Sequence, residues 1–412
     1  MTTAAVALLA ARTAQAQDAT WVGTTNSYTT PTNWSTNSVP TGTAFFGGSG
    51  NSSVSITTFD GTVGGWTFNS NAQNYSFSNE SLSRFRLNGA GIIVNGGSAT
   101  ITNTATLLFG SASSAGSATI TNSPDSPSVG GNLSFRDAST PGNAAIINNG
   151  SLSFENNSTA GNATITNNGG VTFDNTSTAG NATITNNDIL MFSDTSRAGN
   201  ATIINSAKMD FVDSSMAGNA AITNNDIVTF SDTSSAGNSK ITNNQGLRFV
   251  DSSTAGNATI TNNFLLLFLG TSSAENATIT NNLTLGFGEN STAGAATIIT
   301  SSGANTQFLA FASGGVARFI LNGSGTFDIS GLESAGTKVG SIEGSGNVWL
   351  GSKNLAVGGN NLSTVFGGVI SDCGVGCEVP ATGGSLTKEG TGTLILTGGA
   401  ITPARPTSTP AH

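Results

Sequence analysis

A column of acidic residues at regular spacing is the feature of this sequence that could hold a cation. Asp194, Asp213, Asp232 and Asp251 follow one another at steps of 19 residues. If each step is one coil of a stacked structure, the carboxylates lie about 5 Å apart and repel unless they are solvated or bridged by calcium. The G-G-x-G-x-D pattern of calcium-binding β-rolls is absent. Turn capping by these side chains is therefore the favoured interpretation, and calcium binding is the alternative.

Histidine and cysteine are nearly absent, which removes the usual centres of metal and nucleophilic chemistry. His412 is the single histidine and the last of 412 residues, so a histidine-based triad or zinc site lacks its central residue. Cys373 and Cys377 enclose a Gly-Val-Gly segment that could close a small disulfide loop. That loop, or two idle thiols, is favoured over a metal or redox site because partner ligands are missing.

Charge is sparse throughout the chain. Only 8% of the residues are charged, and the formal net charge is −9. Lysine and arginine occur mostly singly, so no basic cluster is evident that could neutralise phosphates, and nucleic-acid binding is excluded. The clustered acids and bases that a β-helix lyase needs are also missing. We therefore predict that the chain is not an enzyme and that it requires no cofactor.

The elements that carry these residues repeat every 19 residues in the middle of the chain. One column is phenylalanine, at Phe135, Phe154, Phe173, Phe192, Phe211, Phe230, Phe249, Phe268 and Phe287. A second is isoleucine, at Ile146, Ile165, Ile184, Ile203, Ile222, Ile241, Ile260, Ile279 and Ile298. A smaller apolar residue precedes nearly every member by two positions, which is the alternation of a strand with one buried face. A Pro- and Ser-rich insertion within 123–130 shifts the register.

Two short strands per unit leave no room for a helix, and such units can bury their apolar faces only by stacking. Leucine-rich repeats need several leucines and an asparagine at fixed offsets, which these units lack. The predicted fold is all-β, a right-handed parallel β-helix with about 19 residues per coil. Repeated asparagines, such as the Asn-Asn pairs beginning at Asn148 and Asn167, are interpreted as stacked amides, with a polar binding strip as the alternative.

One coil departs from the polar pattern on its outer side. Leu266 and Phe268 keep the core columns, so Leu265, Leu267 and Leu269 are expected to point outward. An apolar patch on a polar surface is typical of a contact site for a partner or for self-association, although a covering loop is the alternative. Outward pairs such as Thr164 and Thr166 resemble ice-binding arrays, but other residues interrupt the row.

The N-terminus has the pattern of an export signal. Residues 4–11 are apolar, and Ala14-Gln15-Ala16 fits an A-x-A cleavage site, although no basic residue precedes the apolar run. We interpret residues 1–16 as the remnant of a signal peptide and expect the true start to lie upstream, or the chain to be truncated.

The flanking blocks carry motifs of a known class of protein. The N-terminal block contains Trp21-Val22-Gly23, Asn33-Trp34-Ser35 and Val63-Gly64-Gly65-Trp66, and it resembles the start of bacterial autotransporter passenger domains. Residues 384–398 closely resemble the autotransporter-associated β-strand repeat. The positions that carry this likeness are Gly384, Leu386, Gly390, Gly392, Leu394, Leu396 and Gly398.

The resemblance implies an exported protein at the cell surface or outer membrane of a Gram-negative bacterium, or in the extracellular space. It implies a structural, adhesin-like stalk that mediates adhesion to a host or cell-surface ligand, or self-association. A C-terminal translocator barrel is expected from the family, and its many alternating strands are missing from this sequence. The alternatives are a truncated non-functional passenger fragment, a β-helix enzyme acting on polysaccharides, and an ice-binding-type solenoid.

The predicted organisation follows from these patterns. It consists of the signal-peptide remnant 1–16, an irregular N-terminal β cap at 17–98, the β-helix of repeats at 99–301, a C-terminal β-helix with the strand repeat at 302–398, and a Pro- and Thr-rich disordered tail at 399–412.

Overall fold

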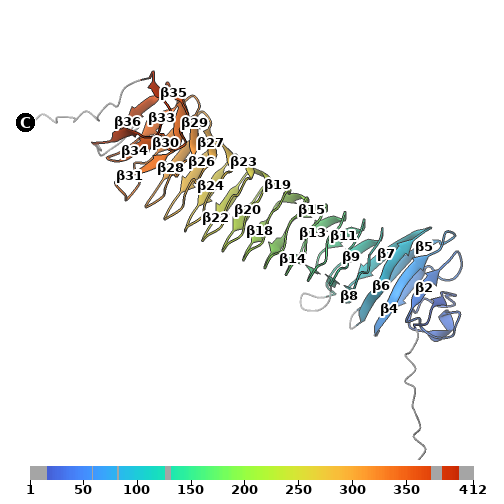
Figure 1. Cartoon of the computed structure of the whole chain (residues 1–412). Helices are drawn as coiled ribbons and strands as arrows, with labels where there is room; N and C mark the ends of the chain where they lie inside the picture. Colours follow the sequence, from blue (N-terminus) through green and yellow to red (C-terminus); the bar gives the residue numbers. More distant parts are fainter. Residues whose placement is uncertain (1–15, 58, 81–82, 126–130, 373–382, 399–412) are drawn as a thin grey trace, which may run out of the picture.

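In the computed structural model, the chain is an elongated parallel β-solenoid with its N-terminal coils at one end and its C-terminal coils at the other (Figure 1). The structure describes residues 16–57, 59–80, 83–125, 131–372 and 383–398. About 17 turns of ~19 residues stack along the axis, with almost no helix. The predicted all-β, parallel β-helix fold is therefore confirmed. Cys373, Cys377, the proposed tail and nearly all of the proposed signal remnant lie outside the described residues.

Two long parallel sheets form two sides of the solenoid. The first sheet contains β1 (Ala19–Thr20), β2 (Thr43–Phe46), β4 (Asp60–Phe68), β6 (Arg84–Val94), β8 (Thr106–Phe109), β10 (Asn132–Phe135), β12 (Ser151–Phe154), β14 (Gly170–Phe173), β16 (Ile189–Phe192), β18 (Lys208–Phe211), β20 (Ile227–Phe230), β22 (Gly246–Phe249), β24 (Leu265–Phe268), β26 (Thr284–Phe287), β28 (Asn305–Phe308), β30 (Thr326–Asp328), β33 (Asn347–Trp349) and β36 (Val369–Ser371). The second sheet contains β3 (Ser53–Ile56), β5 (Asn74–Asn79), β7 (Ser98–Asn103), β9 (Thr119–Asn122), β11 (Ala145–Asn148), β13 (Thr164–Asn167), β15 (Thr183–Asn186), β17 (Thr202–Asn205), β19 (Ala221–Asn224), β21 (Lys240–Asn243), β23 (Thr259–Asn262), β25 (Thr278–Asn281), β27 (Thr297–Thr300), β29 (Arg318–Leu321), β32 (Ser341–Gly344), β35 (Thr364–Phe366) and β38 (Leu394–Leu396).

The third side is narrower and gains strands only near the C-terminal end. In the regular coils it is a row of single parallel bridges, such as those joining Thr178, Arg197 and Met216. Near the C-terminal end it becomes a sheet of β31 (Gly336–Val339), β34 (Asn354–Val357) and β37 (Ser385–Lys388). Within the described residues, the one helical element is the 3-10 turn η1 (Pro31–Asn33). No described helix is long and apolar enough to span a membrane.

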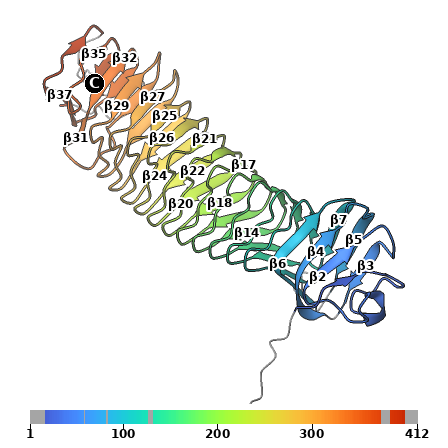
Figure 2. The same cartoon turned by 45° about the vertical axis from the view of Figure 1, so that its right-hand side comes forward.

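The central turns stack directly on one another (Figure 2). Their strands pair in register, so each buried column repeats one residue type. The phenylalanine column from Phe109 to Phe287 is fully buried. Its successive ring centroids lie 4.5–5.2 Å apart, and the ring planes differ by only 4–11°. Offset stacking of this kind adds to the burial of apolar area. The continuous aromatic column therefore forms one edge of an unbroken core.

A buried asparagine column accompanies the aromatic one. Its members include Asn148, Asn167, Asn186, Asn205, Asn224, Asn243 and Asn262, all with no exposed surface. Each Nδ2 donates to the Oδ1 of the next member at 2.7–2.9 Å. The same amide also donates to a strand carbonyl of the next coil, as Asn186 does to Lys208 at 3.1 Å. This is the stacked-amide arrangement predicted from the sequence, and it ties the second sheet to the first at every bend.

An aromatic cluster closes the N-terminal end of the core. Tyr28 and Trp34 are fully buried, with ring centroids 4.9 Å apart, and Trp34 Nε1 donates to the Tyr28 carbonyl at 2.8 Å. Trp66 Nε1 donates to the Tyr28 hydroxyl at 3.3 Å. Burial raises the pKa of Tyr28 far above its usual value, and the hydrogen bond from Trp66 lowers it only in part. The phenol of Tyr28 is therefore neutral in the folded cap.

This phenol predicts a loss of cap stability at alkaline pH. Because the folded pKa of Tyr28 lies above its ordinary value of 10.0, its contribution is fully present below pH 10 and is lost as the pH rises further. We expect tryptophan fluorescence to report this transition, since Trp21, Trp34 and Trp66 are three of the four tryptophans and all are buried in the cap. Tyr28→Phe should flatten the pH dependence. An unchanged alkaline transition in that variant would contradict the assignment.

Candidate functional site

The outward leucines of β24 are one of several places where apolar side chains interrupt the polar surface of the solenoid, others being Ile189, Ile227 and Phe311. Leu266 and Phe268 point into the core and are fully buried, whereas Leu265 and Leu267 alternate with them and face outward. Leu269 follows the strand, and all three outward leucines are half-buried rather than fully exposed. The predicted outward orientation of these residues is therefore observed.

Glycines in the next coil explain why the outward leucines are partly covered rather than fully exposed. Gly286 pairs with Leu267 in the adjacent strand β26, and Gly288 occupies the place that corresponds to Leu269. A Cβ added at Gly286 would meet Leu267 Cδ2 at 2.9 Å, and one at Gly288 would meet Leu269 Cδ2 at 3.0 Å. Leu267 and Leu269 thus lie against glycines of the next coil, which cover part of each leucine side chain.

Further apolar side chains adjoin these leucines and were not singled out from the sequence. Phe264 and Leu283 occupy the same bend in consecutive coils, with exposed fractions of 44% and 43%. Leu309, which takes the column of Leu269 two coils on, has an exposed fraction of 43%. We call the following residues the apolar patch: Phe264, Leu265, Leu267, Leu269, Leu283 and Leu309. Aligning the coils by their phenylalanines would have found these neighbours, because each keeps a fixed offset from its column.

The aspartate column caps turns instead of converging on an open site. Asp194, Asp213, Asp232 and Asp251 have φ values of 54–56°, the left-handed region that asparagine and aspartate tolerate better than most residues. The Oδ2 of Asp213 accepts the backbone N–H of Asp194 at 3.1 Å, and Asp232 does the same for Asp213 at 3.1 Å. Each of these carboxylates therefore accepts a backbone N–H from the turn of the preceding coil, whereas the turn-capping interpretation expected bonds within its own turn. The described residues contain no group of three or more His, Cys, Asp or Glu that could hold a metal ion.

The second sheet carries the outward threonines. Thr183 is exposed and Thr185 is half-buried on β15, but Ala221 and Lys240 take the first position on β19 and β21. Exposed asparagines form further amide rows, for example from Asn200 Nδ2 to Asn181 Oδ1 at 3.2 Å. The threonine row is interrupted by other residues, and the asparagine row is regular and exposed.

The motif at 384–398 forms two strands that stack on the preceding coil. Leu386 lies in β37 and pairs with Leu355, and Leu394 and Leu396 lie in β38, where Leu396 pairs with Phe366. Gly390 lies at the intervening bend with φ of 65°, and Gly392 follows it. Gly384 and Gly398 flank the pair of strands, and a Cβ at Gly398 would come within 2.0 Å of the Gly368 carbonyl oxygen. The motif therefore acts as a stacking unit of the solenoid. Cys373 and Cys377 lie outside the described residues.

Comparisons with protein-family models, with curated proteins and with solved structures gave no match. The class of protein defined by this chain is that of its fold, a parallel β-solenoid of repeats. Function must therefore be inferred from the outer surfaces of the solenoid.

Proposed function

We propose that this protein is an exported, passenger-type β-solenoid that serves as a stiff stalk and associates side by side through the apolar patch. The observation that carries the proposal is a group of apolar side chains on neighbouring coils, of which Phe264, Leu283 and Leu309 are more than 40% exposed. An exposed patch of this kind on a soluble surface is typical of a protein contact. In the proposal, weak contacts made by many associated copies add together and provide adhesion by multivalency.

The cell-surface location in this proposal rests on sequence features. The A-x-A pattern near Ala16 favours export, and the motif at 384–398 resembles the autotransporter-associated strand repeat. The unbroken buried columns support a stalk role, since a solenoid stacked in register resists bending through its nearest-neighbour contacts. We propose no catalytic activity, because the regularly spaced carboxylates are occupied by backbone amides.

Leu267→Asp is expected to abolish self-association while leaving the fold intact. The new carboxylate would have to be desolvated against apolar side chains of the partner copy, which costs several kcal/mol in a paired interface. Sedimentation velocity of the full chain over a range of concentrations measures the effect. The matched control is Thr172→Asp, which occupies the same strand position on β14, away from the patch.

Two additional observations make this test decisive. Leu283→Asp alters a side chain with an exposed fraction of 43%, so it should also block association without disturbing the core. Raising the salt concentration should strengthen association. Salt screens the repulsion between copies that each carry a formal charge of −9, and it does not weaken the burial of apolar surface. Equal association of the wild type, Leu267→Asp and Leu283→Asp would overturn the proposal.

A further inference from the structure

A surface hollow near the N-terminal end of the first sheet gathers arginines that are far apart in the sequence. The hollow has a volume of about 370 Å³ and is lined in part by Arg84, Arg86 and Arg136. Its other lining side chains are mainly hydroxyl and amide groups, among them Thr106, Asn132 and Ser153. Three of the chain's 13 basic residues thus meet on one face of a protein whose net charge is −9.

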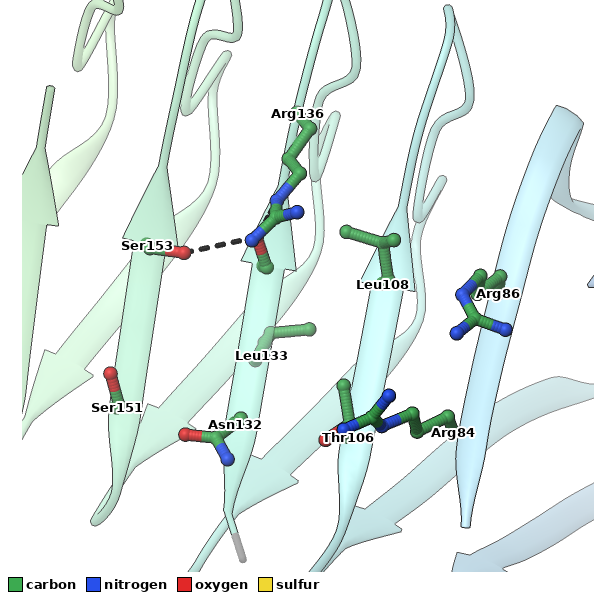
Figure 3. A pocket seen from close by; sticks show the side chains of 10 residues that line it. Arg84, Arg86, Thr106, Leu108, Asn132, Leu133, Arg136, Ser151 and Ser153 are labelled. Atoms are coloured by element: carbon green, nitrogen blue, oxygen red, sulfur yellow. Dashed lines mark hydrogen bonds between the residues drawn. The ribbon is translucent and has the colours of Figure 1, made fainter. Parts of the chain in front are cut away.

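Strand register creates this arrangement. Arg84 and Arg86 are outward residues of β6, where they pair with Thr106 and Leu108 of β8. Arg136 directly follows β10, the next strand beyond β8. Strands are about 4.8 Å apart, so β6 and β10 flank β8 at a separation of about 10 Å. Figure 3 shows Leu108 between Arg86 and Arg136, with Arg84 extending toward Thr106.

The ion pairs around the hollow leave it with a surplus of positive charge. Arg86 Nη1 lies 2.6 Å from Asp60 Oδ1, and Arg136 Nε lies 3.1 Å from Glu155 Oε2. Arg84 is exposed, and no salt bridge of this residue occurs within the described part of the chain. A guanidinium has five N–H donors in a planar fork, so the two paired arginines also retain free donors.

The lining identifies the chemistry of a ligand. Guanidinium forks match the planar carboxylate and the sulfate group, with charge-assisted hydrogen bonds. Hydroxyl and amide groups such as Ser151 and Asn132 match the hydroxyls of a sugar, while Leu108 offers a small apolar area to its C–H face. A nucleic acid would need many more phosphate contacts and aromatic stacking, and no aromatic side chain lines this hollow.

We propose that the hollow between β6 and β10 binds an acidic oligosaccharide, a sugar chain bearing carboxylate or sulfate groups, with Arg84 as the main anion-binding residue. The open sheet surface on either side would let a linear polymer extend beyond the hollow. This inference rests on the proposed adhesive role and names a class of ligand for it. The site lies several coils away from the apolar patch. It would bind its ligand through charge and hydrogen bonds, whereas the patch would bind through apolar burial.

Binding is tested with the full chain by isothermal titration calorimetry against three oligosaccharides of equal length. One is a galacturonate oligomer, one a sulfated glucan oligomer and one a neutral glucan oligomer. We expect the acidic probes to bind and the neutral probe to fail, with affinity falling as salt rises. The carboxylated and sulfated arms identify which anionic group the site prefers.

Arg84→Ala should weaken binding of the preferred acidic probe at least about tenfold, the usual effect of removing a charge-assisted hydrogen bond. Arg248→Ala is the matched control, since Arg248 is an exposed outward arginine of β22 on the same sheet, outside the hollow. Absence of binding by the wild type, equal loss in both variants, or tighter binding of a polyphosphate at Arg84 would overturn the proposal. Self-association strengthens with salt whereas glycan binding weakens, so failure of either proposal is recognised separately.

Discussion

Asn205→Leu is expected to lower the free energy of unfolding by about 3–5 kcal/mol. Asn205 Oδ1 accepts from Asn186 at 2.7 Å, and its Nδ2 donates to Asn224 Oδ1 at 2.9 Å. The same Nδ2 donates to the backbone carbonyls of Ala207 and Ile227. Leucine has a similar volume but no polar atoms, so these buried partners lose hydrogen bonds without gaining water.

Guanidinium denaturation followed by circular dichroism measures this change. The matched control is Asn200→Leu in the same coil, because Asn200 belongs to an exposed row and donates to Asn181 at 3.2 Å. That control should alter the free energy of unfolding by no more than about 0.5 kcal/mol. Equal losses in the two variants would show that the buried amide column contributes nothing special to stability.

Phe211→Ala is expected to cost about 3–5 kcal/mol of unfolding free energy by opening a cavity in the aromatic column. Phe211 stacks on Phe192 and Phe230, with ring centroids 4.7 and 4.6 Å away and ring planes tilted by 5° and 4°. The neighbouring rings cannot close the gap, because the hydrogen-bonded strands β16, β18 and β20 hold the coils at a fixed spacing.

The position of this damage is also predicted. A solenoid is held together by nearest-neighbour contacts, so amides of β16 and β20 should lose hydrogen-exchange protection more than those of β8 or β28. Phe211→Leu fills most of the cavity and should lose distinctly less stability than Phe211→Ala. Uniform loss of protection along the whole rod would contradict a column of local contacts.

The regular coils could be predicted from the sequence because each obeys the same short-range rule. Alternation fixes which residues face inward, and the constant step of 19 residues fixes the register between coils. Phe173 therefore pairs with Phe192, as the spacing predicts. The N-terminal cap has no such repeat. Its long strands β4 and β6 pair with a register shift between Val63 and Gly65, which no local pattern specifies.

The outer surfaces could be predicted only in part. The outward direction of Leu267 follows from alternation, but its half-burial depends on Gly286 in the next coil. The arginine hollow was missed because Arg84 and Arg136 lie on either side of the insertion within 123–130, which disguises their alignment. The buried hydrogen bond from Asn122 Nδ2 to Asn148 Oδ1 shows that the coils continue in register across this insertion.

The central claim, that copies meet at the apolar patch, is tested most directly by pulsed electron paramagnetic resonance between copies. Cys373 and Cys377 are replaced by serine, and a nitroxide is attached at Arg248→Cys, next to Leu267 in the adjacent strand. We predict a short distance between labels on different copies that disappears when Leu267→Asp is added. Associated copies whose labels at position 248 remain far apart, or whose short distance survives Leu267→Asp, would contradict the claim.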